Sequence, residues 1–168
     1  MTKRTEKELD QALDRELKNN PAFVSWLLSK TKFASEDGKY CWSNANYPWG
    51  KVKLEVPGAT PGSIDIIKRE GETDVLAVFE TTSGRRVALH IENKLAGGKF
   101  TEYQPELYAA RAAAWTGHPK YENYEDWETI LMAPRSFRER FPAECSRFDR
   151  FVAHEELAAF IEKFGPQS

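Results

Sequence analysis

Hydrophobic and polar positions follow a helical period over the first thirty residues of the chain. Apolar residues recur there at intervals of three and four, the spacing of one helix face. This pattern predicts a helix over residues 4–18 and a second over residues 21–30. Thr5 and Glu8 have the spacing of a capping box, and Pro21 suits the first turn of the second helix. The buried face of the first helix is expected to consist of Leu9, Ala12, Leu13 and Leu17.

From residue 62 the period changes to two, which is typical of β-strands. Residues 64–67, 74–81 and 86–94 are predicted to be three successive strands of a meander. In the third strand, one face is expected to carry Val87, Leu89 and Ile91, and the other Ala88, His90, Glu92 and Lys94. The preceding residues 31–62 have no clear period, which indicates an ordered loop or irregular hairpin with a short strand over 51–56.

The remainder of the chain alternates between helices and single strands. Gly97-Gly98 separates the meander from this part. The expected elements are a helix over 101–115, a buried strand over 129–133, a short helix over 135–140, a weak strand over 148–152 and a closing helix over 155–164. Residues 1–168 are thus expected to form a single α/β domain, and no internal repeat is present.

The candidate chemistry lies in the segment from Ser63 to Lys94. Asp65 interrupts an apolar run, and a buried carboxylate without a partner costs several kcal/mol, so it needs a metal or a cation. Glu92 and Lys94 share one strand face. If the two strands are neighbours, Asp65 and Glu92 converge on a divalent metal, with the Ile91 carbonyl as a further ligand. A structural ion pair among these side chains is the alternative.

These residues and the order of the elements resemble the PD-(D/E)xK nuclease superfamily. Ser63-Ile64-Asp65 matches the first half of its motif and the stretch 92–94 (Glu-Asn-Lys) matches the second. Ile64 stands where many members have proline. The resemblance covers residues 4–133 and implies a restriction-endonuclease-like αβββαβα core, with a central mixed four-stranded sheet flanked by helices.

The same resemblance implies roles for individual side chains. Many members carry Gln-x-x-x-Tyr on the following helix, and Gln104 and Tyr108 supply it here, on one helix face. Many also have an acid on the first helix, for which Glu6 is the candidate and Asp10 the second choice. The expected catalytic residues are Asp65, Glu92, Lys94, Gln104 and Tyr108. The expected ligands of Mg²⁺, for which Mn²⁺ substitutes, are Glu6, Asp65, Glu92 and Ile91.

Composition limits how the chain can bind nucleic acid. The formal net charge is -2 over 168 residues, which argues against a generic nucleic-acid coat and leaves only local phosphate contacts. Each basic residue individually is more simply explained as a solvated surface group. The candidates for phosphate contact are Arg85, Arg86, Lys99, Arg135 and Arg138.

Several other classes of protein are excluded or disfavoured. No phosphate-binding loop, dinucleotide fingerprint, zinc-protease or serine-hydrolase motif occurs. Cys41 and Cys145 lack zinc-ligand spacing and are read as free thiols. The N-terminus lacks the apolar stretch of a signal peptide, and no run is long enough to cross a membrane. A cytoplasmic protein is therefore expected.

The leading hypothesis is a magnesium-dependent nuclease that acts on DNA phosphodiesters. One alternative keeps the fold and binds nucleic acid without cleaving it. A second is a protein-interaction domain, such as a partner in a defence or mobile-element system, with the aromatic segment 42–49 as its contact surface. A homodimer is a candidate assembly, because nucleases that cut both strands often dimerise.

Overall fold

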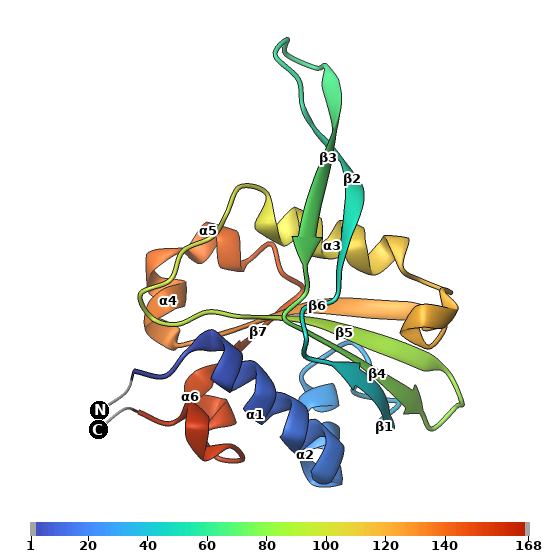
Figure 1. Ribbon diagram of the computed structural model, residues 1–168, viewed down its shortest axis with the longest axis vertical. Coiled ribbons are helices and arrows are strands. Elements are labelled where there is room, and N and C mark those ends of the chain that lie inside the picture. The colour runs from blue at the N-terminus through green and yellow to red at the C-terminus, as the bar shows by residue number, and fades with distance from the viewer. Residues whose placement is uncertain (1–2, 167–168) are drawn as a thin grey trace.

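A mixed five-stranded sheet forms the centre of the computed structural model, which describes residues 3–166 (Figure 1). The strand order is β1-β4-β5-β6-β7, where β1, β4 and β5 are antiparallel and β5, β6 and β7 are parallel. The strands span Gly38–Asn44 (β1), Val75–Thr81 (β4), Arg86–Asn93 (β5), Asp126–Ala133 (β6) and Arg150–Ala153 (β7). The fold class is therefore α/β, as expected, but the sheet has five strands rather than four.

Helices cover both faces of this sheet. One face carries α1 (Glu6–Asn19), α2 (Pro21–Ser29), α6 (His154–Leu157) and the 3₁₀ turn η2 (Glu162–Phe164). The other face carries α3 (Gln104–Ala114), α4 (Arg135–Arg140) and α5 (Pro142–Cys145), with the 3₁₀ turn η1 (Pro119–Tyr121) beside them. Among the described residues, no helix has the length and apolar character needed to cross a bilayer.

The central strands bury both of their faces. In β4, Val75 and Phe79 join the core beneath α1 and α2, whereas Leu76 faces the opposite layer. In β5, Leu89 faces α1 and α2, and Ala88 faces the α3 side, so the predicted alternation is confirmed. Because it is buried on both faces, β4 reads as a nearly continuous apolar run, whereas β5 is recognisable in the sequence by its regular alternation.

The first two helices begin where their capping residues predict. Thr5 and Glu8 form the reciprocal capping box of α1, and Asn20 caps α2 ahead of Pro21. The helix predicted over 101–115 instead begins at Gln104, because the preceding Tyr103 has a left-handed backbone with φ 58°. The closing helix predicted over 155–164 is also shorter, since α6 ends at Leu157.

The prediction that residues 64–67 form the first strand of the sheet is wrong. The edge position beside β4 belongs to β1, which lies in the segment read as a loop or irregular hairpin. Residues 64–67 instead lie in β3 (Ile64–Glu72), which pairs only with β2 (Trp49–Pro57) in a hairpin that projects away from the sheet (Figure 1). Ile64 and Ile66 looked like core residues, but each is 65% exposed.

This difference in burial gives a stability prediction. Phe79→Ala removes a fully buried ring and is expected to lower the free energy of unfolding by about 3–5 kcal/mol. Ile64→Ala, on the exposed hairpin, is expected to change it by less than about 0.5 kcal/mol. Urea denaturation followed by far-UV circular dichroism measures both. A comparable loss from the two changes would contradict this placement of the hairpin.

Candidate functional site

Asp74 and Glu92 come together at one end of the sheet. Val75 of β4 pairs with Ile91 of β5, so one residue further along the antiparallel ladder Asp74 lies opposite Glu92. Both side chains are buried, with residue exposures of 8% and 4%. The backbone N–H of Asn93 donates to Asp74 Oδ2 at 2.9 Å. The register of one strand pair therefore sets the spacing of the two carboxylates.

Lys94 is held beside Glu92 by an extension of the sheet. Its backbone N–H donates to the carbonyl oxygen of Met132 on β6 at 2.9 Å, just beyond the end of β5. Its Nζ lies 3.0 Å from Glu92 Oε1, and both side chains are largely buried. Nζ also stands 5.6 Å from the centroid of the Phe100 ring. An ammonium group is thus fixed next to the carboxylate in a poorly hydrated place.

Helix α3 positions Glu92 from the opposite layer. Gln104 Nε2 donates to Glu92 Oε1 at 2.9 Å, and the hydroxyl of Tyr108 donates to Glu92 Oε2. The same hydroxyl accepts a hydrogen bond from the backbone N–H of Asp74 at 3.0 Å. Tyr108 therefore connects both acid-bearing strand ends. The structure brings Gln104 and Tyr108 to Glu92 from one face of the helix, where the sequence spacing predicted them.

Helix α1 adds two acids from the other side of the sheet. Asp10 is fully buried, and its Oδ1 accepts from Asn93 Nδ2 at 2.7 Å. Its Oδ2 accepts from the hydroxyl of Tyr47 at 3.3 Å. Glu6 lies one turn earlier, and its Oε1 is 3.4 Å from the backbone nitrogen of Leu95. The two first-helix candidates thus both reach this end of the sheet.

A cavity of about 320 Å³ opens among these residues. Its acidic lining includes the Glu6, Asp74 and Glu92 side chains, together with two glutamates of β3. Lys94 and Arg111 also line it. The complete set of lining residues that bear charge is Glu6, Glu70, Glu72, Asp74, Glu92, Lys94 and Arg111. Carboxylates outnumber cations, which makes the cavity a place for a positively charged ligand.

Burial and mutual repulsion raise the pKa of three buried carboxyl groups at this site, Asp10, Asp74 and Glu92. Desolvation, with a smaller contribution from the charge of Glu92, raises the pKa of Asp10 to about 7. Desolvation also raises the pKa of Asp74 well above its ordinary value, with Glu92 and Asp10 adding to the effect. Desolvation raises the pKa of Glu92, although Lys94 and Tyr108 oppose the rise. Without a cation, the cluster therefore tends to retain protons.

The donor set fits a hard divalent cation. Mg²⁺ and Mn²⁺ prefer carboxylate oxygens and retain several waters. Within residues 3–166, however, no three acidic, histidine or cysteine side chains stand at metal-binding spacing. Glu92 is instead bonded to Lys94, Gln104 and Tyr108, and Asp74 Oδ2 to Asn93. Asp74 Oδ1 has no hydrogen bond to the described residues, and the Glu92–Lys94 pair would have to rearrange around an ion.

The expected convergence of Asp65 and Glu92 does not occur. Asp65 is exposed on the projecting hairpin opposite Val56, because β3 pairs with β2 and not with β5. Asp74 occupies the place expected for Asp65. The signal that could have identified it is its position directly before the most apolar strand, with only a hairpin separating it from Glu92. Ile91 lies one residue before Glu92, and its side chain is in the core.

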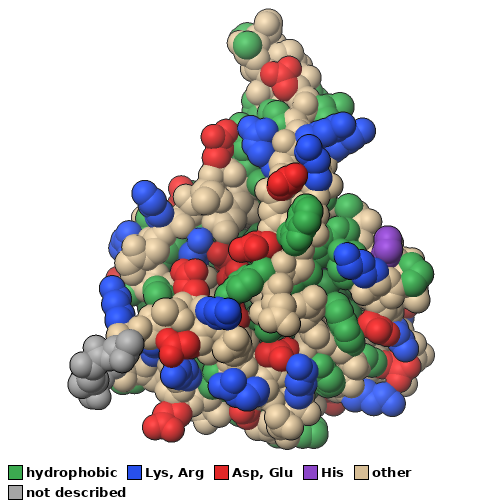
Figure 2. Space-filling model, in the orientation of Figure 1, with side chains coloured by type: hydrophobic (Ala, Val, Ile, Leu, Met, Phe, Trp, Pro, Cys, Tyr) green, Lys and Arg blue, Asp and Glu red, His purple; other side chains and the backbone are tan. Residues whose placement is uncertain are grey.

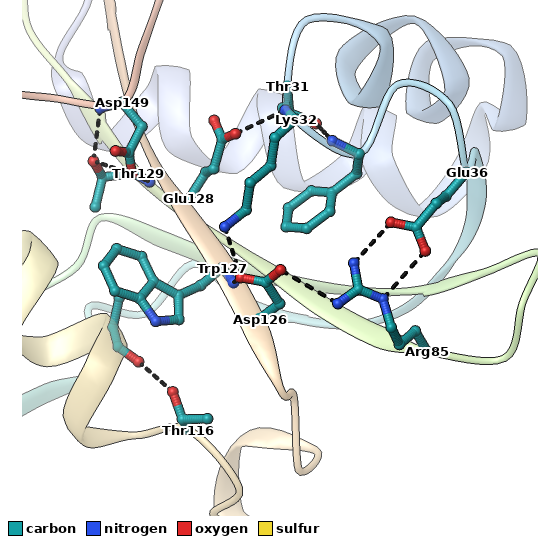
Figure 3. A network of polar contacts seen from close by, with 12 residues as sticks. Thr31, Lys32, Glu36, Arg85, Thr116, Asp126, Trp127, Glu128, Thr129 and Asp149 are labelled. Carbon is teal, nitrogen blue, oxygen red and sulfur yellow. Dashed lines mark hydrogen bonds and ion pairs between the residues drawn. The ribbon is translucent and has the colours of Figure 1, made fainter.

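The basic residues proposed as phosphate contacts do not gather at this cavity. Arg85 is held between Glu36 and Asp126 (Figure 3), at distances of 2.7 and 3.3 Å. Arg86 pairs with Glu122 at the start of β5, about 20 Å along the strand from Glu92. Three other candidates differ in their surroundings: the Arg135 backbone N–H donates to Glu155, Arg138 lies over the Phe151 ring, and Lys99 is exposed in the loop before α3.

Arg111 is a site residue that the sequence reasoning missed. It follows Gln104 and Tyr108 on the same face of α3, at the i+7 position, and this spacing was the available signal. The guanidinium carbon lies 4.6 Å from the centroid of the Tyr108 ring, and Nη2 donates to the carbonyl oxygen of Glu72 at 2.7 Å. Arg111 therefore supplies a buried cation at the cavity wall.

His90 is a satisfied core residue beside the site. Its Nδ1 lies 3.0 Å from Thr73 Oγ1 and its Nε2 lies 3.1 Å from the hydroxyl of Tyr124. Complete burial, together with the charge of Arg111, lowers the pKa of the imidazole to about 3. His90 is thus neutral at physiological pH and is fully hydrogen-bonded. His90 therefore acts as a structural histidine and is not poised to carry protons.

Searches against protein-family models, curated proteins and solved structures found no match. The arrangement of side chains is therefore what bears on function. Three acids, a lysine and a glutamine line one cavity, and a buried tyrosine hydrogen-bonds to one of these acids beneath it. They are Glu6, Asp74, Glu92, Lys94, Gln104 and Tyr108.

The carboxyl pKa values predict how stability depends on pH. Asp10 titrates near 7 in the folded protein but near 3.8 when unfolded, so the folded state holds more protons between these values. The free energy of unfolding of the metal-free protein should therefore fall as pH rises from about 4 to 8. Asp10→Asn should flatten this slope. Urea denaturation in EDTA at several pH values measures this slope of the free energy of unfolding against pH. The exposed Asp65→Asn serves as the control. Equal slopes in wild type and in Asp10→Asn would show that Asp10 is not the group responsible.

Proposed function

We propose that this protein is a metal-dependent nuclease that hydrolyses phosphodiester bonds of DNA, built on a restriction-endonuclease-like core. The observation that carries the proposal is the meeting of Asp74, Glu92 and Lys94 at the ends of two adjacent strands. Buried acids next to a lysine, in a cavity, form the kind of site that phosphoryl-transfer chemistry requires.

The resemblance to the PD-(D/E)xK superfamily is stronger with Asp74 in place of Asp65. Asp74 directly precedes one strand of a hairpin, and the sequence 92–94 lies at the end of the other. A helix that carries Gln104 and Tyr108 follows, and β6 then pairs in parallel with β5. The cavity is then lined by Glu6, Asp74, Glu92, Lys94 and Gln104, and Tyr108 binds Glu92 behind it. Asp65, on the projecting hairpin, cannot join this group.

The residues suggest a division of labour in the reaction. Mg²⁺ or Mn²⁺ held by Asp74, Glu92 and Glu6 would polarise the phosphodiester and lower the pKa of a bound water. The Lys94 ammonium can orient the attacking water and stabilise negative charge that develops on the phosphoryl oxygens. Gln104 and Tyr108 keep the Glu92 carboxylate in one orientation. Arg111 offers a second positive charge to the substrate at the cavity wall.

Substitution of the two aspartates provides the most direct test. Asp74→Asn should lower cleavage of plasmid and single-stranded DNA in Mg²⁺ by about 100-fold or more, because a neutral amide holds a divalent ion poorly. Asp65→Asn should leave the rate within about twofold of wild type. Lys94→Ala should also lose about 100-fold. Gel assays with Mg²⁺, Mn²⁺ or EDTA measure the rates.

Several outcomes of this experiment would reject the proposal. Cleavage that persists in EDTA or in Lys94→Ala would exclude the mechanism. Loss of activity in Asp65→Asn but not in Asp74→Asn would restore the first assignment of the acid. DNA binding without cleavage in any metal, unaffected by Glu92→Gln, would favour a nuclease-like binding domain. Urea denaturation of each variant shows whether a loss of activity reflects unfolding.

Tyr108 is expected to act as a positioning residue. Tyr108→Phe keeps the ring in its packed place but removes the hydroxyl between Glu92 and the Asp74 backbone. Cleavage should fall by about 10- to 100-fold, and a higher Mg²⁺ concentration should be needed for half-maximal rate. A titration of cleavage rate against Mg²⁺ separates this effect from instability. An unchanged metal requirement would show that the hydroxyl only supports the fold.

A further inference from the structure

The projecting hairpin of β2 and β3, residues 49–72, here called the arm, carries an unusual exposed face. Trp49, Ile64 and Ile66 are the exposed large apolar residues of the described chain, at 64%, 65% and 65%. The pairing of β2 with β3 puts all three on one side of the arm, since Trp49 lies opposite Glu72 and Ile66 opposite Glu55. Ile64 and Ile66 lie near the free end. Apolar residues are thus concentrated where the fold does not bury them.

A basic band crosses the arm between its apolar end and its base (Figure 2). Of its four cations, Lys51, Lys53 and Lys68 lie on the same face as Ile64 and Ile66, with Glu70 opposite Lys51, and Arg69 lies on the other face; all four are exposed. Lys53 lies directly opposite Lys68, an arrangement that disfavours the hairpin because like charges repel. None of the four forms an ion pair with the described residues, whereas ten other lysines and arginines do. The band is thus available to a polyanion.

The arm is fixed to the wall of the candidate active site. Gly50 and Gly71 form a cross-strand pair against α3, where a Cβ on Gly50 would lie 3.1 Å from the Trp115 ring. A Cβ on Gly71 would lie 2.5 Å from Nη1 of Arg111. Two neighbouring glutamates of β3 line the cavity itself. The base of the arm and the cavity therefore form one continuous surface.

We infer that the arm binds the DNA duplex next to the cleaved bond: its basic band contacts backbone phosphates, and Ile64 and Ile66 wedge between base pairs. This inference rests on the proposed nuclease function and specifies its substrate as duplex DNA that is distorted on binding. Apolar side chains inserted from the minor groove kink a duplex in this way, and lysines and arginines neutralise phosphates without reading sequence. The arm as a whole has as many acids (Glu55, Asp65, Glu70 and Glu72) as cations, so the phosphate contact is local to the facing Lys53–Lys68 pair and Lys51.

The dimensions of the arm agree with this role. Lys68 is two residues from Glu70 of the cavity lining, about 7 Å along the strand, and Ile64 is about 13 Å further. This reach corresponds to about six nucleotides of one strand at roughly 3.4 Å each.

The binding test separates the two parts of the arm. Lys53→Ala/Lys68→Ala should weaken binding of a fluorescein-labelled duplex in EDTA by about 10- to 100-fold and reduce the slope of log K against log salt by about two. Ile64→Ser/Ile66→Ser should retain that slope but lose the fluorescence rise of 2-aminopurine placed in the duplex. Lys39→Ala/Lys120→Ala, which removes two exposed charges elsewhere, should match wild type in both readouts.

A small substrate distinguishes failure of the arm from failure of the nuclease proposal. Bis(p-nitrophenyl) phosphate reaches only the cavity, so arm variants should hydrolyse it at the wild-type rate while cutting duplex DNA slowly. Equal losses on both substrates, or duplex binding equal to that of the control variant, would overturn the inference and leave the nuclease proposal standing. If wild type hydrolyses neither substrate, the nuclease proposal fails. The binding measurements on the fluorescein-labelled duplex then still test whether the arm binds DNA. Dimers that become monomers in Ile64→Ser/Ile66→Ser, with duplex binding unchanged, would assign the face to a second copy and overturn the inference.

Discussion

The candidate site depends on keeping the Glu92 carboxylate in one place while it is almost excluded from water. Three side chains from the following loop and helix surround its two oxygens: Lys94, Gln104 and Tyr108. Each of these contacts would be weak in water but is strengthened by the low local dielectric. The strand register then brings Asp74 to the same point, and the acids of α1 approach from the other layer. A carboxylate with fewer partners would be too costly to bury there.

This constraint also explains the unequal success of the sequence reasoning. Glu92 and Lys94 could be identified because they end a strand whose alternation is regular, and Gln104 and Tyr108 because helical spacing places them on one face. Asp65 was chosen because it interrupts an apolar run, and that choice assumed that an apolar run is buried. The isoleucines around it are exposed on the arm, so the carboxylate never needed a partner. A period of two shows that side chains alternate between the two faces of a strand. It does not show which sheet the strand joins, or whether another layer buries either face.

The fold was predicted best where both faces of a strand are buried and helix caps are explicit. Strands β4 and β5 and helices α1 and α2 meet these conditions. The edge strand β1 does not, because its aromatic and polar residues lie partly exposed and have no clean period. The order of strands in the sheet is a long-range property, and β1 pairs with β4 across the whole intervening arm. Local patterns carry no signal for a connection of that kind.

Asn93 shows that the residue between Glu92 and Lys94 is a structural junction. Its backbone N–H holds Asp74, its side-chain amide donates to Asp10, and its amide oxygen lies 3.3 Å from Nε2 of His154 at the start of α6. A motif written with a free middle position treats this residue as a spacer. In this chain Asn93 ties the end of the sheet that holds the candidate site to the first helix and to the C-terminal layer. The backbone contact to Asp74 survives a change of side chain, but the two side-chain contacts do not, so a substitution of Asn93 would remove a partner of Asp10 on α1 and of His154 on α6 together.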